Sequence, residues 1–296
     1  MKLKQIFLIF ISIFSSCIYS QIDKSKFIVN PRIIIFDIGG TLLTVDSLKA
    51  QSYFGWDMFG YIISSFFKGK TQTIAHTKDF YLNTLSMIKD PNLQNNYNVI
   101  GMNGKLMPQL QYYSFIGKIS LQDCLKIGNK WIEENKDNKI IFKNDLEKRV
   151  FQKMFNFNFD PNQFMRFQKY TKEIKLLEKL YMVKDKSGKR KNICIILSNQ
   201  PKEMIRLLKS YFPRIFQFSD MQFFSCDEGL SKPDKKLFEK CISMCPKKCY
   251  KTAFFIDDEK QNIEAVKNIK PDNFNIVGIF AAEAKTILKS NYGLLI

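Results

Sequence analysis

Histidine is almost absent from this chain: one residue, His76, stands among 296. Zinc sites in proteins usually combine cysteine with histidine or with further cysteines. Three of the seven cysteines, Cys241, Cys245 and Cys249, follow one another at intervals of four. With no histidine near them and no fourth clustered ligand, we expect free thiols or a disulfide in this trio rather than zinc. His76 lies in a polar, helix-like stretch, and we expect it at the surface.

Acidic residues are few relative to basic ones. The chain has 28 Asp and Glu against 46 Lys and Arg, which gives a formal net charge of +18. Such an excess draws a protein toward polyanions or acidic surfaces. The densest basic block, residues 184–191, lacks the interleaved aromatic side chains of a single-strand binder. We therefore expect the lysines on solvated faces and no specific nucleic-acid partner.

Long apolar runs are missing after the first twenty residues, so no later segment is expected to span a membrane. Two lysines precede an apolar run at residues 6–14, and small residues follow, as in a secretory signal peptide. We expect residues 1–20 to be a signal peptide, the mature chain to begin at Gln21, and the protein to be exported, either periplasmic or secreted. A lipoprotein acylated at Cys17 is the alternative, in which case a lipid anchor would provide the membrane contact. An uncleaved membrane anchor is the third option.

Three apolar runs of the chain each stop at polar side chains. Such runs are typical of buried parallel strands, whose carboxyl ends collect ligands and chemistry in an open α/β sheet. A lysine, Lys232, stands just before a further segment that reads as the start of a helix. The runs are residues 33–36 before Asp37, residues 193–197 before Ser198 and Asn199, and residues 253–256 before Asp257 and Asp258.

These side chains suit one chemistry when they share a site. Carboxylates are the ligands that a hard divalent cation such as Mg²⁺ prefers. The Ser198 hydroxyl and the Lys232 ammonium are suited to phosphate oxygens, which leaves Asp37 to face the phosphorus as a nucleophile.

The same segments resemble the motifs of a known family, the haloacid dehalogenase-like (HAD) superfamily of hydrolases. They read FDIGGT, LSN, SKPD and FIDD, in the order of that family. The segment GLSKPDKKLFEK, followed by FFIDDEKQNIEAV, is similar to the sequences of the branch whose helical cap is inserted after the first motif. The resemblance covers nearly all of the chain after the first thirty residues. It implies a Mg²⁺-dependent hydrolase that acts on a small phosphorylated substrate through an aspartyl-phosphate.

The resemblance also implies a role for each site residue. Asp37 would be the nucleophile, and Ser198 and Lys232 would complete the catalytic set. Phosphate would be bound by Ser198, Asn199 and Lys232, and the metal by Asp37, the Gly39 carbonyl, Asp257 and Asp258, with Asp258 favoured over Asp257.

Gly39 departs from the family pattern. Most phosphatases of the superfamily carry a second aspartate at this position, two residues after the nucleophile, which protonates the leaving group. General acid catalysis is typically worth about 100- to 10,000-fold in rate. A phosphate-binding protein without turnover is therefore the alternative. A hydrolase of carbon–halogen bonds is a third hypothesis, and the acidic pair Asp257-Asp258 argues against it because that chemistry needs no metal.

The fold class expected is α/β, a Rossmann-like, doubly wound parallel sheet with an inserted α-helical cap domain. We expect the core at residues 21–45 and 161–296 and the cap at 46–160, because a parallel crossover needs far fewer residues than the stretch between Asp37 and residue 193. Apolar spacing of three and four predicts cap helices at 47–67, 73–88, 121–134 and 144–155. In the core it predicts helices at 171–180, 201–208, 233–242 and 260–269, with further strands at 221–225 and 275–280.

Overall fold

The computed structural model describes residues 26–67, 73–101, 104–245, 252–267, 269 and 275–292. The expected signal peptide, with Cys17, and the third cysteine of the trio, Cys249, lie outside the described residues. The His76 side chain is also not described. No helix in the described part of the chain is both long enough and apolar enough to cross a membrane.

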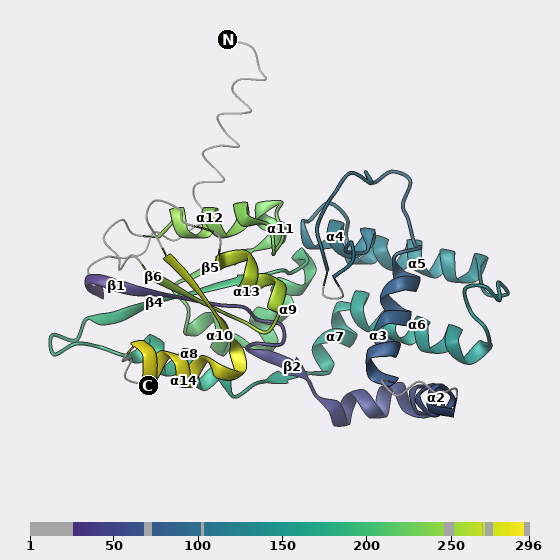
Figure 1. Ribbon diagram of the computed structural model, residues 1–296, viewed down its shortest axis with the longest axis horizontal. Helices are drawn as coiled ribbons and strands as arrows, with labels where there is room; N and C mark the ends of the chain where they lie inside the picture. The colour runs from purple at the N-terminus through teal and green to yellow at the C-terminus, as the bar shows by residue number, and fades with distance from the viewer. Residues whose placement is uncertain are drawn as a thin grey trace, which may run out of the picture.

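A five-stranded parallel sheet forms the centre of the core, in the strand order β5-β4-β1-β6-β7 (Figure 1). β1 lies in the middle and pairs with β4 on one side and β6 on the other. The carboxyl ends of these three strands therefore meet. The strands are β1 Phe27–Phe36, β4 Arg190–Ser198, β5 Met221–Phe224, β6 Thr252–Asp257 and β7 Asn275–Phe280.

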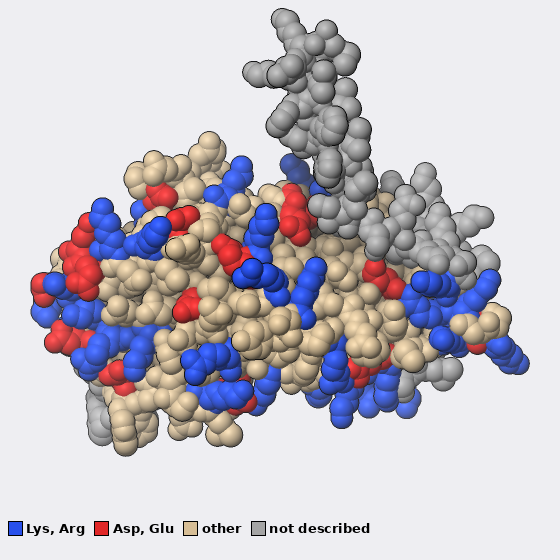
Figure 2. Space-filling model, turned by 180° about the vertical axis from the view of Figure 1, so that it is seen from behind, with Lys and Arg blue, Asp and Glu red and all other residues tan. Residues whose placement is uncertain are grey.

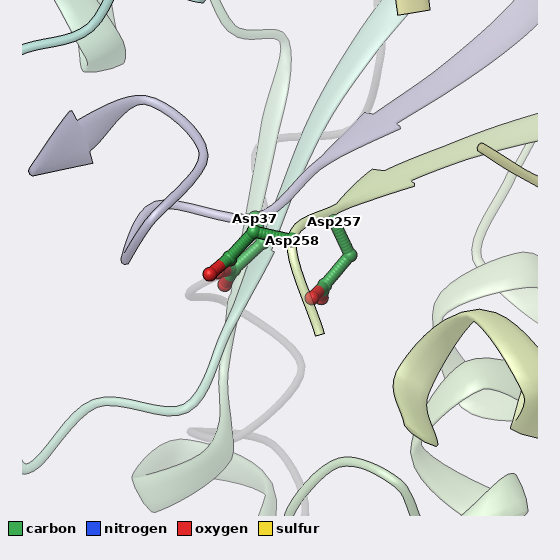
Figure 3. Close-up of side chains that lie close together, drawn as sticks. All are labelled: Asp37, Asp257 and Asp258. Carbon is green, nitrogen blue, oxygen red and sulfur yellow. The ribbon is translucent and has the colours of Figure 1, made fainter. Parts of the chain in front are cut away.

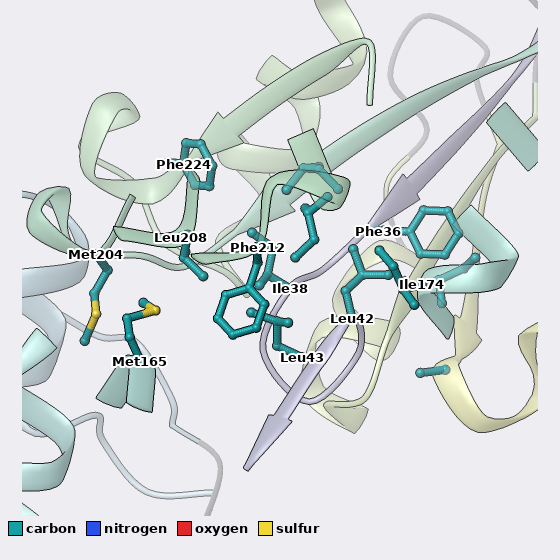
Figure 4. Packing of buried hydrophobic residues seen from close by; sticks show 14 of the residues in the cluster. Phe36, Ile38, Leu42, Leu43, Met165, Ile174, Met204, Leu208, Phe212 and Phe224 are labelled. Atoms are coloured by element: carbon teal, nitrogen blue, oxygen red, sulfur yellow. The ribbon is translucent and has the colours of Figure 1, made fainter. Parts of the chain in front are cut away.

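Helices cover both faces of this sheet, because successive residues of a strand point to opposite sides. Ile33 and Ile35 of β1 belong to one buried cluster with α12 and α13. Ile34 and Phe36 belong to a second cluster with α8, α9, α10 and α14 (Figure 4). The α/β, doubly wound architecture is thus as predicted. The core helices are α8 Glu173–Met182, α9 Lys202–Tyr211, α10 Pro213–Gln217, α11 Ser225–Glu228, α12 Lys235–Ser243, α13 Lys260–Lys267 and α14 Ala284–Tyr292, with a 3₁₀ turn, η3, at Ala281–Glu283.

A helical unit is inserted between β1 and β4 and lies beside the sheet rather than over one of its faces (Figure 1). A short antiparallel pair, β2 Leu43–Val45 and β3 Gln168–Tyr170, joins it to the core. Its helices are α2 Ser47–Phe67, α3 Thr73–Leu85, α4 Gln109–Phe115, α5 Leu121–Glu134, α6 Asp145–Phe159 and α7 Pro161–Arg166. We call this unit the cap. The limits 46–160 stay a prediction.

The cap has its own aromatic interior, which runs without a break into one face of the sheet. Phe151 and Phe155 of α6 are fully buried in the same cluster as β1. Gly128 lets α5 approach α6 closely, since a Cβ there would lie 1.9 Å from the Phe155 ring. Figure 4 shows Met165 of α7 facing Met204 of α9, where cap and core meet. The cap is therefore packed on the core.

Two details of the core differ from the predictions. Pro233 precedes α12 rather than lying in its first turn, because Asp234 caps the helix by accepting a hydrogen bond from the Lys236 amide at 2.9 Å. Arg190, although it lies within the basic block at 184–191, belongs to β4 and is buried beside Asp220. The loop before it is exposed as expected.

Of the cysteine trio, Cys241 and Cys245 are both buried, and Cys245 Sγ lies 3.5 Å from the Cys241 carbonyl oxygen. The basic side chains that produce the net charge are spread over the face shown in Figure 2 and alternate there with acidic ones.

Candidate active site

Asp37 follows β1 at the centre of the sheet edge and is buried, with 6% of its surface exposed. Its amide donates to the carbonyl of Ile256 in β6, which fixes the backbone at this point. The Lys232 ammonium lies 2.7 Å from Asp37 Oδ1. Burial raises the pKa of Asp37 to about 7, because the attraction of Lys232 only partly offsets it and Asp257 adds a further rise. A bound cation would reverse this rise by favouring the carboxylate.

Lys232 is shared between two acids. Its Nζ lies 2.7 Å from Asp257 Oδ2 as well, and the side chain is only 3% exposed. The pKa of Lys232 is raised above its ordinary value: burial lowers it, but Asp257 and Asp37 together raise it by more. One fixed cation thus faces two buried carboxyl groups.

Asp257 is held from behind by further donors. Its Oδ1 accepts from the Glu259 amide at 2.8 Å, and the Asn262 Nδ2 lies 3.2 and 3.1 Å from its two oxygens. The residue is fully buried and does not line the cavity described below. These bonds suit Asp257 to positioning Lys232.

Asp258 has the opposite character. Its side chain reaches the surface, and the Thr41 hydroxyl donates to its Oδ1 at 3.3 Å. The protein around the carboxyl still removes part of its hydration, which raises the pKa of Asp258, as does the nearby Asp257. Ligand oxygens of Asp37, Asp257 and Asp258 all lie within 4.8 Å of one another (Figure 3). Such a group of acids suits a hard cation, and Asp37 and Asp258 are the two that also line the cavity.

Ser198 and Asn199, at the end of β4, support Asp37 and Lys232. Ser198 ends β4 and is 1% exposed, and its hydrogen bond lowers the pKa of Asp37. The Asn199 side chain is engaged on both atoms: Oδ1 accepts from the Lys232 amide at 2.8 Å, and Nδ2 donates to the Lys232 carbonyl at 3.0 Å. Asn199 therefore positions Lys232 through its side chain, which leaves its backbone N–H as the group for the predicted phosphate contact.

The two glycines after Asp37 differ sharply. Gly40 has φ +71° and a Cβ there would lie 2.0 Å from Asp258 Oδ2, so no side chain fits. Gly39 has no positive φ, and its only neighbour within 4 Å of a Cβ is Asp37 Oδ2, at 4.0 Å. The backbone therefore requires glycine at position 40 but not at position 39. A side chain at position 39 would point toward Asp37.

These residues surround a cavity of about 330 Å³ between core and cap. Of the predicted site residues, all but Asp257 line it: Asp37, Gly39, Ser198, Asn199, Lys232 and Asp258. Thr41 and Asn262 were missed by the sequence reasoning. Asn262 is a 2% exposed polar residue of α13 that binds Asp257, and no pattern in the neighbouring sequence marks this contact.

No family model matches the chain, and no curated protein matches it. Solved structures do. A HAD family enzyme from Bacteroides thetaiotaomicron is 15% identical, with 85% of this chain and 93% of that chain covered and a TM-score of 0.44. The same organism's HAD family enzyme in complex with magnesium and inorganic phosphate is 14% identical, with 85% and 94% covered and a TM-score of 0.40. A predicted HAD-like family hydrolase from Porphyromonas gingivalis is 15% identical, with 84% and 90% covered and a TM-score of 0.43.

Proposed function

We propose that this chain is a Mg²⁺-dependent phosphohydrolase of the HAD-like superfamily that forms an aspartyl-phosphate at Asp37. The observation that carries the proposal is that the Lys232 ammonium lies 2.7 Å from carboxylate oxygens of both Asp37 and Asp257. These two carboxyl groups also form an acidic cluster with Asp258. The motif order of the sequence supports the same assignment.

The arrangement assigns each group a task. Asp37 and Asp258 would hold Mg²⁺, which when bound would neutralise phosphoryl charge. Lys232 binds Asp37 Oδ1, so Oδ2 is the oxygen left to form the bond to phosphorus while the bond to the leaving oxygen breaks. Lys232 and Ser198 would bind phosphoryl oxygens. Water then cleaves the aspartyl-phosphate, which releases phosphate and restores the carboxylate.

A protein beginning at Gln21 tests this. Acetyl phosphate and an aryl phosphate should be hydrolysed in the presence of Mg²⁺, because neither leaving group needs a general acid. EDTA should stop the reaction because it removes the metal. Asp37→Asn should abolish hydrolysis of both. Mg²⁺ should also raise the melting temperature by mass action, and Asp258→Asn should remove that rise. No hydrolysis and no Mg²⁺ effect on melting would refute the proposal.

A phosphate-binding protein without turnover is the second candidate, and Gly39 favours it because no carboxyl group stands at that position. In that case inorganic phosphate would bind with Mg²⁺, whereas wild type and Asp37→Asn would be equally inactive on the activated substrates. The two candidates therefore give different results in the same assay.

We further propose that the protein is exported. The proposal rests on the two lysines and the apolar run at residues 6–14. Amino-terminal sequencing of the native protein should find Gln21. An acylated Cys17 would indicate a lipoprotein instead, and a soluble cytoplasmic form that keeps Met1 would contradict export.

A further inference from the structure

The cavity over Asp37 has a cap side that is unlike its core side. The core side carries the charged groups of the site. The cap side carries, within the described residues, no Asp, Glu, Lys or Arg at all. Its wall is formed mainly by apolar and aromatic side chains, among them Tyr81, Leu82, Leu85, Met107, Phe115 and Phe159.

The cap closes this space against the core by direct hydrogen bonds. The Leu121 amide at the start of α5 donates to Glu203 Oε1 at 3.0 Å, and the Ser225 hydroxyl donates to the Phe115 carbonyl at 2.6 Å. A group that packs against the cap wall gives up its water on that side. A charged group would lose its hydration without gaining a partner, which is costly, whereas an apolar group gains by the same transfer.

Polar side chains on the cap side are few: Gln111 and Ser114 of α4, and Asn158 of α6, which forms one polar corner with Tyr81. The Tyr81 hydroxyl is buried and lies within hydrogen-bonding reach of Asn158. Its polar neighbour is Asn158, which lines the same cavity and donates from Nδ2 to the Met154 carbonyl at 2.8 Å. A hydroxyl and an amide side by side on a cavity wall can both hydrogen-bond to one polar group of a ligand.

We propose that the substrate is a phosphate ester of an uncharged, mainly apolar alcohol or phenol, with at most one polar group, directed at the Tyr81–Asn158 corner. This inference rests on the proposed function, since it places the phosphoryl group at Asp37. The volume of about 330 Å³ lies at the lower end of the range for small-molecule sites. A ring-sized leaving group fits that volume better than a nucleotide or a peptide.

Binding to the Asp37→Asn protein in the presence of Mg²⁺ tests the inference without turnover. Calorimetry would compare 2-phenylethyl phosphate, glycerol 3-phosphate and phosphoserine, with inorganic phosphate as the reference. We expect 2-phenylethyl phosphate to bind at least 10-fold more tightly than either of the others. All three are esters of primary alcohols, so the missing acid at Gly39 does not enter the comparison.

Variants locate the effect on the cap wall. Leu82→Asn, which places an amide in the wall, should reduce the preference for the phenylethyl ester at least threefold. Leu125→Asn is the matched control, because Leu125 is similarly half-buried in the cap but does not line the cavity. Gln111→Arg should improve phosphoserine binding, since it adds a cation to the wall. Tyr81→Phe should weaken the binding of an analogue with a ring hydroxyl more than it weakens the binding of 2-phenylethyl phosphate.

The two proposals can fail separately. If inorganic phosphate binds with Mg²⁺ but the three esters bind alike, the apolar-substrate inference is wrong and the proposed function stands. Tighter binding of phosphoserine than of the phenylethyl ester would contradict it equally. If inorganic phosphate does not bind even to the wild-type protein with Mg²⁺, the proposed function fails, and this inference fails with it.

Discussion

The core half and the cap half of the active cavity are stabilised by different interactions. On the core half, one cation and two carboxyl groups are buried together and held by bonds from residues at the ends of β1, β4 and β6. On the cap half, the described wall is uncharged and depends on packing. The first arrangement suits a fixed chemistry at one phosphoryl group, and the second suits selection among leaving groups. Substitutions in the core half should therefore change the turnover rate, and substitutions in the cap half should change the substrate preference.

Removal of Lys232 should have the largest effect on stability. Lys232→Met leaves two buried carboxyl groups without their shared cation, and breaking a buried pair typically costs about 3–5 kcal/mol. Chemical denaturation at pH 8 would measure the loss. Lys169→Met is the control, because its pair with Asp46 is 3.7 Å long and half exposed, and such pairs are worth at most about 1 kcal/mol. Equal losses in the two variants would show that the core half is not organised around Lys232.

The raised pKa of Asp37 should make the metal-free protein less stable as pH rises. The pKa is about 7 in the folded protein and 3.8 ordinarily, so the folded state binds the proton more tightly between these values. This contribution to stability is fully present below pH 3.8 and is lost as pH rises through about 7. Relative to Asp37→Asn, wild type in EDTA should lose about 1.4 kcal/mol per pH unit in that window. Saturating Mg²⁺ should flatten the slope, and an equal slope in both proteins would contradict the assignment.

The two glycines allow a paired test of the turn after Asp37. Gly40→Ala should destabilise the protein and weaken Mg²⁺ binding, since its Cβ would displace Asp258 and its φ is +71°. Gly39→Asp should fold normally, because the position is open and faces Asp37. It should raise the turnover of simple alkyl phosphates by about 10- to 100-fold. This lies at or below the low end of the range for general acid catalysis. Thermal melting and rates on an alkyl and an aryl ester would check both. Equal tolerance at the two positions would contradict the geometry.

The sequence predicted the core half far better than the cap half. Strands such as residues 33–36 have an unbroken apolar pattern that ends in a charged side chain, so both the element and its functional end can be recognised. Helix α5 was also placed at its observed bounds, helped by the Ser120 hydroxyl that accepts from the Asp123 amide. Local signals of this kind are contained in neighbouring residues.

The remainder depends on contacts between distant segments. Nothing near Asn199 in the sequence shows that its amide binds the Lys232 backbone, 33 residues away. Nothing near Tyr81 distinguishes a cavity wall from an ordinary cap interior, because both are apolar and aromatic. The open space at Gly39 likewise became visible only with the positions of Asp37 and Asp258.

The most direct test of the account is whether Asp37 becomes phosphorylated. Wild-type protein would be mixed with acetyl phosphate and Mg²⁺, quenched in acid within milliseconds to seconds, digested and examined by mass spectrometry, with Asp37→Asn treated in parallel. The account predicts one added phosphoryl group on the peptide that contains Asp37, absent in Asp37→Asn and absent when EDTA replaces Mg²⁺. Hydrolysis of acetyl phosphate with no adduct at any quench time, or an equal adduct in Asp37→Asn, would contradict it.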